Sequence, residues 1–141
     1  VHSLIHALVR YTGVRFVLIS PRELRVPDYI RIDVLEENHI PYEEVENLED
    51  AMAKLDVLYM TRVQKERFDE TEYQNLRSKY ILSKSMLSEA KSNMKILHPL
   101  PRIDEITLDV DETPHAYFFQ QAANGVYARQ ALLALVLNKE I

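Results

Sequence analysis

The chain has 141 residues, the length of one domain, and its formal net charge of -5 argues against general nucleic-acid binding, which requires a basic surface. It contains no cysteine, which excludes disulfides and thiolate zinc sites, and no apolar run reaches the roughly 18 residues of a membrane-spanning helix. With no secretory signal peptide visible either, we expect a cytoplasmic protein with no membrane or nucleic-acid partner.

Helical and strand patterns alternate in the first 60 residues. Apolar side chains recur at spacings of three and four in 2–11 and in 28–38, where Asp28 can cap the helix. Asn47 can cap a third helix, with Asp50 three residues later as in a capping box. The apolar residues of the last two helices expected to face the core are Ile30, Val34, Leu35, Ala51, Met52 and Leu55. Short apolar runs predict strands at 14–19, 41–45 and 57–60.

The second half of the chain continues this alternation. A polar loop over 61–70 precedes a helix that Thr71 can cap, and a short helix is expected from Ser83 or Ser85 to about residue 91. Thr113 and Pro114 predict the start of a long helix that runs to about residue 138. Further strands are predicted at 80–82 and 94–97.

This alternation predicts an α/β fold with three layers. A parallel sheet of about five strands would be covered by helices on both faces, as in Rossmann-like domains, and a long C-terminal helix would follow it. The far end of that helix, 131–137, is apolar nearly all round. Such a helix requires burial on more than one side, so we expect its end to expose apolar surface that a partner would cover.

Two polar side chains follow the strand predicted at 57–60. Arg62 and Gln64 lie two residues apart, so an extended backbone would direct both to the same side. A guanidinium fork can bind a carboxylate through two hydrogen bonds, and the amide of Gln64 both donates and accepts. Because ligands of open α/β sheets bind outside the carboxyl ends of the strands, the pair predicts a site for an amino acid or dicarboxylate. The alternative is a solvated loop in which Arg62 and Arg67 pair with nearby acidic residues.

A proline-rich loop, His98-Pro99-Leu100-Pro101, follows the strand predicted at 94–97 and should lie at the same sheet edge as Arg62. Its prolines stiffen the backbone, and Leu100–Pro101 is a candidate cis peptide. Such a loop can present bare carbonyl groups to an NH₂ group of a ligand. An ordinary tight turn would have the same composition.

Other polar residues give weaker signals. Arg129 lies in the long helix with Gln120, Gln121 and Asn124 upstream, and this stripe either borders a pocket or faces solvent. His2 and His6 are spaced as a metal pair, but no third ligand accompanies them, so we interpret them as solvated histidines and expect no metal. No motif pairs a nucleophile with a base, so an enzyme of this sequence would act by positioning and electrostatics.

Several motifs are long and specific: VHSL (1–4), YMTRVQKER (59–67), HPLPRIDEI (98–106), FQQA (119–122), NG (124–125) and ARQALL (128–133). In this order they resemble the catalytic chains of the aspartate carbamoyltransferase family, and the resemblance covers essentially the whole chain. It corresponds to the C-terminal, aspartate-binding domain. Residues 1–141 would be that domain, without the N-terminal domain that binds carbamoyl phosphate.

The resemblance implies an activity and a set of residue roles. The family transfers a carbamoyl group from carbamoyl phosphate to the amino group of L-aspartate, which gives N-carbamoyl-L-aspartate for pyrimidine synthesis and uses no cofactor. The residues it implies in substrate binding are Arg62, Gln64, Pro99, Leu100 and Arg129. Arg62 would bind a carboxylate, and the carbonyls of Pro99 and Leu100 would hold the carbamoyl amino group. The residues it implies in domain closure are Arg67, Tyr73 and Asp104, with Tyr73 and Asp104 as a linked pair.

The resemblance also implies partners and limits. The parent would be a homotrimer of catalytic chains, with regulatory chains as an open question, and the missing domain would carry the Ser-Thr-Arg-Thr phosphate loop. We therefore expect little or no turnover from the isolated chain. The sister ornithine family has Ser-Met-Gly and His-Cys-Leu-Pro at the two loops, and neither pattern occurs here. A second hypothesis is a non-catalytic binding or regulatory domain derived from the same fold.

Overall fold

The computed structural model describes residues 1–62, 69 and 79–139. The chain divides into two compact units, 1–53 and 54–141, and each unit is described by itself.

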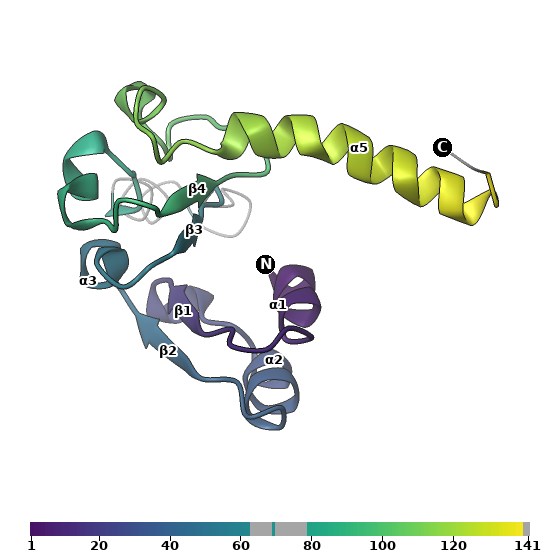
Figure 1. The fold of residues 1–141 in the computed structure, drawn as a ribbon. Coiled ribbons are helices and arrows are strands. Elements are labelled where there is room, and N and C mark those ends of the chain that lie inside the picture. The colour runs from purple at the N-terminus through teal and green to yellow at the C-terminus, as the bar shows by residue number, and fades with distance from the viewer. Residues whose placement is uncertain (63–68, 70–78, 140–141) are drawn as a thin grey trace. The chain divides into compact units, whose positions relative to one another are not determined.

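The first unit is built on a pair of parallel strands with short helices (Figure 1). β1 (Phe16–Ile19) pairs with β2 (Tyr42–Val45), and Phe16 lies opposite Tyr42. The helical segments of this unit are α1 (His2–Leu8), a 3-10 turn (Arg22–Leu24), α2 (Asp28–Ile30), a π-helical segment (Arg31–Glu36) and α3 (Glu49–Met52). β-branched and aromatic residues favour the first strand, as the sequence predicts.

The core of the first unit is an apolar cluster on its helices. Its buried members are Ile5, Ile30, Val34 and Leu35, and partly buried residues such as Phe16 pack against them. The inner faces predicted for 28–38 and for the third helix are therefore confirmed, since Ala51, Met52 and Leu55 are buried as well. Burial of each such side chain contributes about 1.5–3 kcal/mol relative to exposure.

Two helix starts in the first unit differ from the prediction. Asn47 does not cap α3, because its amide donates to Asp50 Oδ2 (2.9 Å) and Leu48 occupies the N-cap. Asp28 is the first residue of α2, and Pro27 precedes it at the N-cap. Beyond Ile30 the helix continues with π-helical hydrogen bonding, and the Ile40 N–H donates to the Leu35 carbonyl where it ends.

The second unit is built around strand β4 (Figure 1). β3 (Val57–Tyr59) pairs in parallel with β4 (Lys95–Leu97), and Tyr59 lies opposite Leu97. On its other side β4 forms a single bridge from Ile96 to Ala116, through hydrogen bonds of Ile96 N–H to the His115 carbonyl and of Tyr117 N–H to the Ile96 carbonyl. β4 is thus held from both sides, and Ile96 is fully buried.

Three helical segments complete the described part of the second unit: 3-10 helices at Lys84–Glu89 and Leu108–Val110, and α5 (Phe118–Val136). α5 begins later than predicted, because Thr113 does not cap it: the Thr113 hydroxyl donates to the Val110 carbonyl (2.7 Å) and Tyr117 is the N-cap. The helix ends at Val136 with Leu137 as its C-cap, and the next residue, Asn138, has a left-handed φ of 49°. The Lys139 N–H closes back on the Ala134 carbonyl (2.9 Å). Asn is one of the residues that tolerate this terminating conformation.

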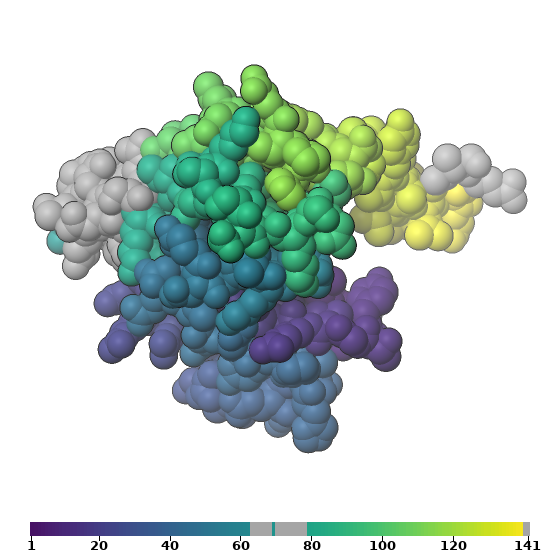
Figure 2. Space-filling model, turned by 60° about the vertical axis from the view of Figure 1, so that its left-hand side comes forward, coloured from purple at the N-terminus to yellow at the C-terminus, as the bar shows by residue number. Residues whose placement is uncertain are grey.

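The second half of α5 exposes apolar side chains, as predicted for its far end (Figure 2, yellow). The exposed large apolar residues between 130 and 137 are Leu132, Leu133, Leu135, Val136 and Leu137, each at least 62% exposed. None of the helices in the described residues is long and apolar enough to cross a membrane.

The predicted sheet of about five strands is wrong for the described residues. Their strands form two separate two-stranded parallel sheets, β1-β2 and β3-β4. The strand predicted at 80–82 makes only an isolated bridge between Leu82 and Ile106, because a 3-10 helix begins two residues later at Lys84 and ends the extended segment. The α/β class and the parallel pairing are confirmed, and so is the long C-terminal helix.

Candidate functional site

The candidate site lies where β3 and β4 end. The strands are parallel and adjacent. The Met60 N–H donates to the Leu97 carbonyl (2.8 Å) at the point where both strands end. Arg62 follows two residues after Met60, and His98 follows directly after Leu97. As predicted, the arginine and the proline-rich loop therefore leave the same edge of one sheet, and the Arg62 side chain is exposed there.

The loop 98–101 has an unusual backbone. Leu100–Pro101 is a cis peptide, as predicted, and Leu100 has a φ of 47°, in the left-handed region that leucine rarely occupies. Among the described residues, none donates a hydrogen bond to the carbonyl oxygen of Pro99 or of Leu100. Pro99 is exposed and Leu100 is half-buried. Two carbonyl groups are thus available to an external N–H donor.

His98 is buried and anchors the beginning of the loop. Its backbone N–H donates to Gln121 Oε1 in the first turns of α5 (2.8 Å). Its ring accepts at Nδ1 from the Leu100 N–H (2.9 Å), and its Nε2 lies 2.7 Å from Glu105 Oε1. Because Nδ1 is the acceptor, the ring proton is on Nε2 and donates to the carboxylate. The imidazole therefore joins the two ends of the loop.

Glu105 anchors the end of the loop and is only 5% exposed. Besides the His98 ring, its carboxylate accepts from the backbone N–H groups of Ile103 (3.1 Å) and Asp104 (3.2 Å) through Oε2. Burial alone would raise the pKa of Glu105, but these N–H donors and the imidazole favour the charged form and together hold its pKa below the usual value. The backbone of Glu105 is fixed too, since its carbonyl accepts from Leu82 N–H (2.8 Å).

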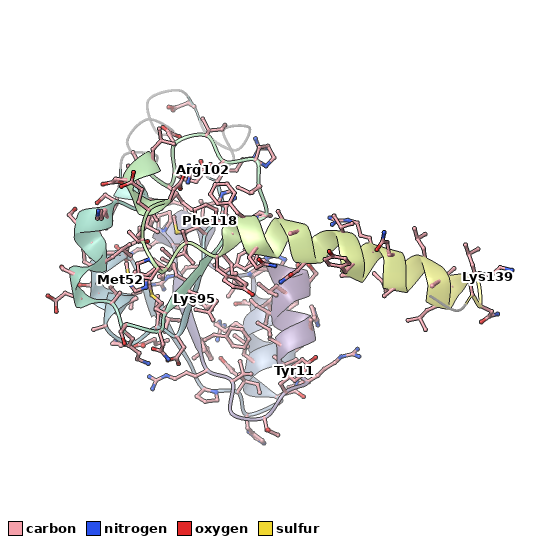
Figure 3. The ribbon with its side chains drawn as sticks, turned by 45° about the horizontal axis from the view of Figure 1, so that its top comes forward. Tyr11, Met52, Lys95, Arg102, Phe118 and Lys139 are labelled. Atoms are coloured by element: carbon pink, nitrogen blue, oxygen red, sulfur yellow. The ribbon has the colours of Figure 1, made fainter. Side chains whose placement is uncertain are left out.

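Arg102 is a third residue that supports the loop, after His98 and Glu105. Its guanidinium donates to both carboxylate oxygens of Asp111. It also lies over the ring of Phe118 (5.2 Å to the centroid; both residues are labelled in Figure 3) and over that of Phe119 (6.0 Å). The bidentate carboxylate pair and the cation–π contact both favour a planar guanidinium over a lysine. Arg102 therefore ties the segment after Pro101 to the start of α5.

The remaining predicted residues differ in what the structure says of them. Asp104 is half-buried beside Glu105. Arg129 is exposed on α5, where Nη1 donates to the Gly125 carbonyl of its own helix (2.9 Å). Gln64, Arg67 and Tyr73 lie outside the described residues, so their predicted roles stay predictions.

No group of three His, Cys, Asp or Glu side chains arranged for a metal ion occurs among the described residues. His2, one half of the spacing considered above, has Nδ1 within 2.8 Å of the Tyr29 hydroxyl.

Sequence reasoning missed the supports of the loop. Glu105 and Arg102 are visible in the sequence only within a matching motif, with no assigned role, and Gln121 only within another motif and in the polar stripe of the long helix. A histidine and a glutamate that flank a two-proline loop are a usable signal, because both are polar and each is next to an apolar residue, Leu97 or Ile106. Their hydrogen bond itself depends on how the loop folds back, which residue order does not give.

Comparisons with known proteins place the chain in a family. The family model described as "Aspartate/ornithine carbamoyltransferase, Asp/Orn binding domain" matches residues 1–136. The aspartate carbamoyltransferase catalytic subunit of Aliivibrio salmonicida is 60% identical over 141 residues, which are 100% of this chain and 45% of that protein. The chain therefore spans about half the length of the curated relatives it matches.

Solved structures show the same likeness. The catalytic subunit of M. jannaschii aspartate transcarbamoylase matches with a TM-score of 0.89 and 39% identity, over 97% of this chain and 45% of that one. Aspartate transcarbamoylase from Trypanosoma cruzi in complex with N-(phosphonacetyl)-L-aspartic acid matches with a TM-score of 0.83 and 32% identity, over 94% of this chain and 43% of that one.

Proposed function

The chain belongs to the aspartate/ornithine carbamoyltransferase family, and we propose that it forms the aspartate-binding half of an aspartate carbamoyltransferase. The reaction would transfer the carbamoyl group of carbamoyl phosphate to the amino group of L-aspartate, with N-carbamoyl-L-aspartate and phosphate as products. Carbamoyl phosphate would be bound chiefly by residues outside this chain. The enzyme would be cytoplasmic, with catalytic chains assembled as a homotrimer.

The observation that carries this proposal is the pairing of β3 with β4, because it brings two complementary functions to one sheet edge. Arg62 offers a planar cation for a carboxylate of aspartate. The carbonyls of Pro99 and Leu100 offer acceptors for the carbamoyl NH₂ group. For the amine of aspartate to attack the carbamoyl carbon, the two substrates must be held next to each other. Such positioning accelerates a reaction without any covalent intermediate on the protein.

The chemistry of the β3 loop favours aspartate over ornithine. A guanidinium at position 62 would attract the second carboxylate of aspartate and repel the side-chain ammonium of ornithine. The named relatives that match the whole chain are aspartate enzymes, in agreement with this choice. No observation favours a non-catalytic regulatory domain.

The remaining residues complete the proposed site. Gln64 would bind aspartate beside Arg62, and Arg129 would border the bound substrate from α5. Arg67 would pair with the other domain on closure, while Tyr73 and Asp104 would link the β3 loop to the proline-rich loop. These roles rest on the family resemblance.

The test is a carbamoylation assay on the full-length polypeptide that contains this chain, with L-aspartate and L-ornithine offered separately. We expect N-carbamoyl-L-aspartate, and no citrulline. Activity with ornithine alone would overturn the assignment of the substrate, and activity with neither amino acid would overturn the proposed function.

A further inference from the structure

The proline-rich loop holds its shape through buried side chains that the proposed reaction does not touch. Leu100 sits at a φ of 47°, which an L side chain adopts only when its surroundings impose it. The Leu100 N–H, the group that fixes this conformation, donates to His98 Nδ1 (2.9 Å). The imidazole therefore contacts, and helps to hold in place, the backbone that carries the two available carbonyls.

The imidazole is itself fixed on its other side. Nε2 donates to Glu105 Oε1 (2.7 Å), and the two side chains are 2% and 7% exposed, so water does not compete for this contact. Glu105 is in turn immobilised by the N–H groups of Ile103 and Asp104. With the Gln121 amide holding the backbone at His98, this chain of contacts leaves the ring one orientation. A hydrogen-bonded carboxylate also keeps the proton on Nε2, so that Nδ1 stays an acceptor.

We propose that His98 and Glu105 are positioning residues that direct the carbonyls of Pro99 and Leu100 at the carbamoyl nitrogen. This inference rests on the proposed function. Neither side chain would touch a reacting atom. If the Nδ1 acceptor were lost, the Leu100 N–H would be left without its partner, the peptide would rotate, and the carbonyls would no longer converge on one NH₂ group.

A matched pair of substitutions at His98 separates the contact made by Nδ1 from the contact made by Nε2. His98→Asn keeps an acceptor oxygen near the Nδ1 position and loses the contact with Glu105, whereas His98→Gln keeps a donor near the Nε2 position and loses the acceptor for Leu100. In the full-length polypeptide we expect His98→Gln to lower kcat about 100-fold, the size of effect that a misplacement of about 1 Å produces. His98→Asn should retain about 10-fold more activity than His98→Gln if the Leu100 contact is the one that matters.

Inorganic phosphate provides a readout that general damage to the fold would not reproduce, because it lacks the carbamoyl NH₂ group. In His98→Gln the affinity for carbamoyl phosphate should fall about 10-fold, while inhibition by inorganic phosphate should stay within about 2-fold of the unsubstituted protein. Glu105→Gln should show the same selectivity and serves if His98→Gln does not fold. Glu112→Gln, an exposed carboxylate in the same unit, is the control.

The outcomes separate this inference from the function on which it rests. An unsubstituted protein without carbamoyltransferase activity overturns the proposed function. The positioning roles alone are overturned if the unsubstituted protein is active and His98→Gln and Glu105→Gln lose affinity for phosphate and carbamoyl phosphate equally. They are also overturned if these variants lose affinity for neither compound. Equal activities of His98→Asn and His98→Gln would also overturn them.

Discussion

Replacing Glu105 by glutamine removes the charge from the buried carboxylate that closes the proline-rich loop, and the structure sets the size of the effect. The carboxylate accepts from His98 Nε2 and from the N–H groups of Ile103 and Asp104, and it is 5% exposed. Hydrogen bonds to a charged acceptor contribute about 1.5–3 kcal/mol each, and glutamine retains one of the two acceptor atoms. We therefore expect Glu105→Gln to lower the local opening free energy by about 2–4 kcal/mol near neutral pH.

The pH dependence of this loss is a second, independent expectation. The pKa of Glu105 in the folded chain is below its usual value, so its contribution to stability is complete above the unfolded pKa of about 4.3 and disappears as the pH falls through the folded pKa. The difference between Glu105→Gln and the unsubstituted chain should therefore shrink on acidification below about pH 4.

Hydrogen exchange, followed by mass spectrometry on peptides covering 95–118, measures this opening. Glu112→Gln is the control, because Glu112 is exposed and its replacement should change the opening free energy by less than about 0.5 kcal/mol at any pH. A loss at Glu105→Gln that is equally small, or one that persists unchanged in acid, would refute the reasoning.

Three other substitutions test separate parts of the account. Arg62→Ala in the full-length polypeptide should weaken transition-state binding of aspartate by about 2–5 kcal/mol, seen as a fall in kcat/KM, and unchanged kinetics would remove Arg62 from the site. Arg102→Lys keeps the charge but loses the two-pronged contact with Asp111, so thermal unfolding should show a loss of about 1–2 kcal/mol; an equally stable variant would contradict the importance of the planar group. Gly125→Ala should stabilise α5 by up to about 1 kcal/mol in urea unfolding, since the added methyl meets only the flexible end of Arg129, and destabilisation would mean that this end cannot move.

The sequence was sufficient for the part of the site that depends on strand order. Arg62 and His98 each follow an apolar run of strand length, and parallel neighbours place their carboxyl ends at one edge. The cis peptide at Leu100–Pro101 was a candidate from the sequence, because cis bonds occur almost only before proline and prolines on both sides of a leucine favour an irregular loop.

Contacts that depend on how a loop folds back were not predictable. The hydrogen bond between His98 and Glu105 joins residues seven apart, and nothing in their spacing distinguishes it from solvated side chains. The predicted helix caps at Asn47 and Thr113 were wrong for the same reason. Both are good cap residues, but their side chains hydrogen-bond instead to Asp50 and to the Val110 carbonyl. The number of strands was overestimated because Tyr80–Leu82 has strand composition and yet forms only one bridge in the described chain.

The most direct test of the central claim is a structure of the full-length polypeptide with N-(phosphonacetyl)-L-aspartic acid, the compound present in one of the Trypanosoma cruzi structures. The account predicts that the Arg62 guanidinium lies within hydrogen-bond distance of a carboxylate of this compound, with the carbonyls of Pro99 and Leu100 facing the same bound molecule. A structure in which the compound's carboxylates are bound away from the ends of β3 and β4 would contradict it.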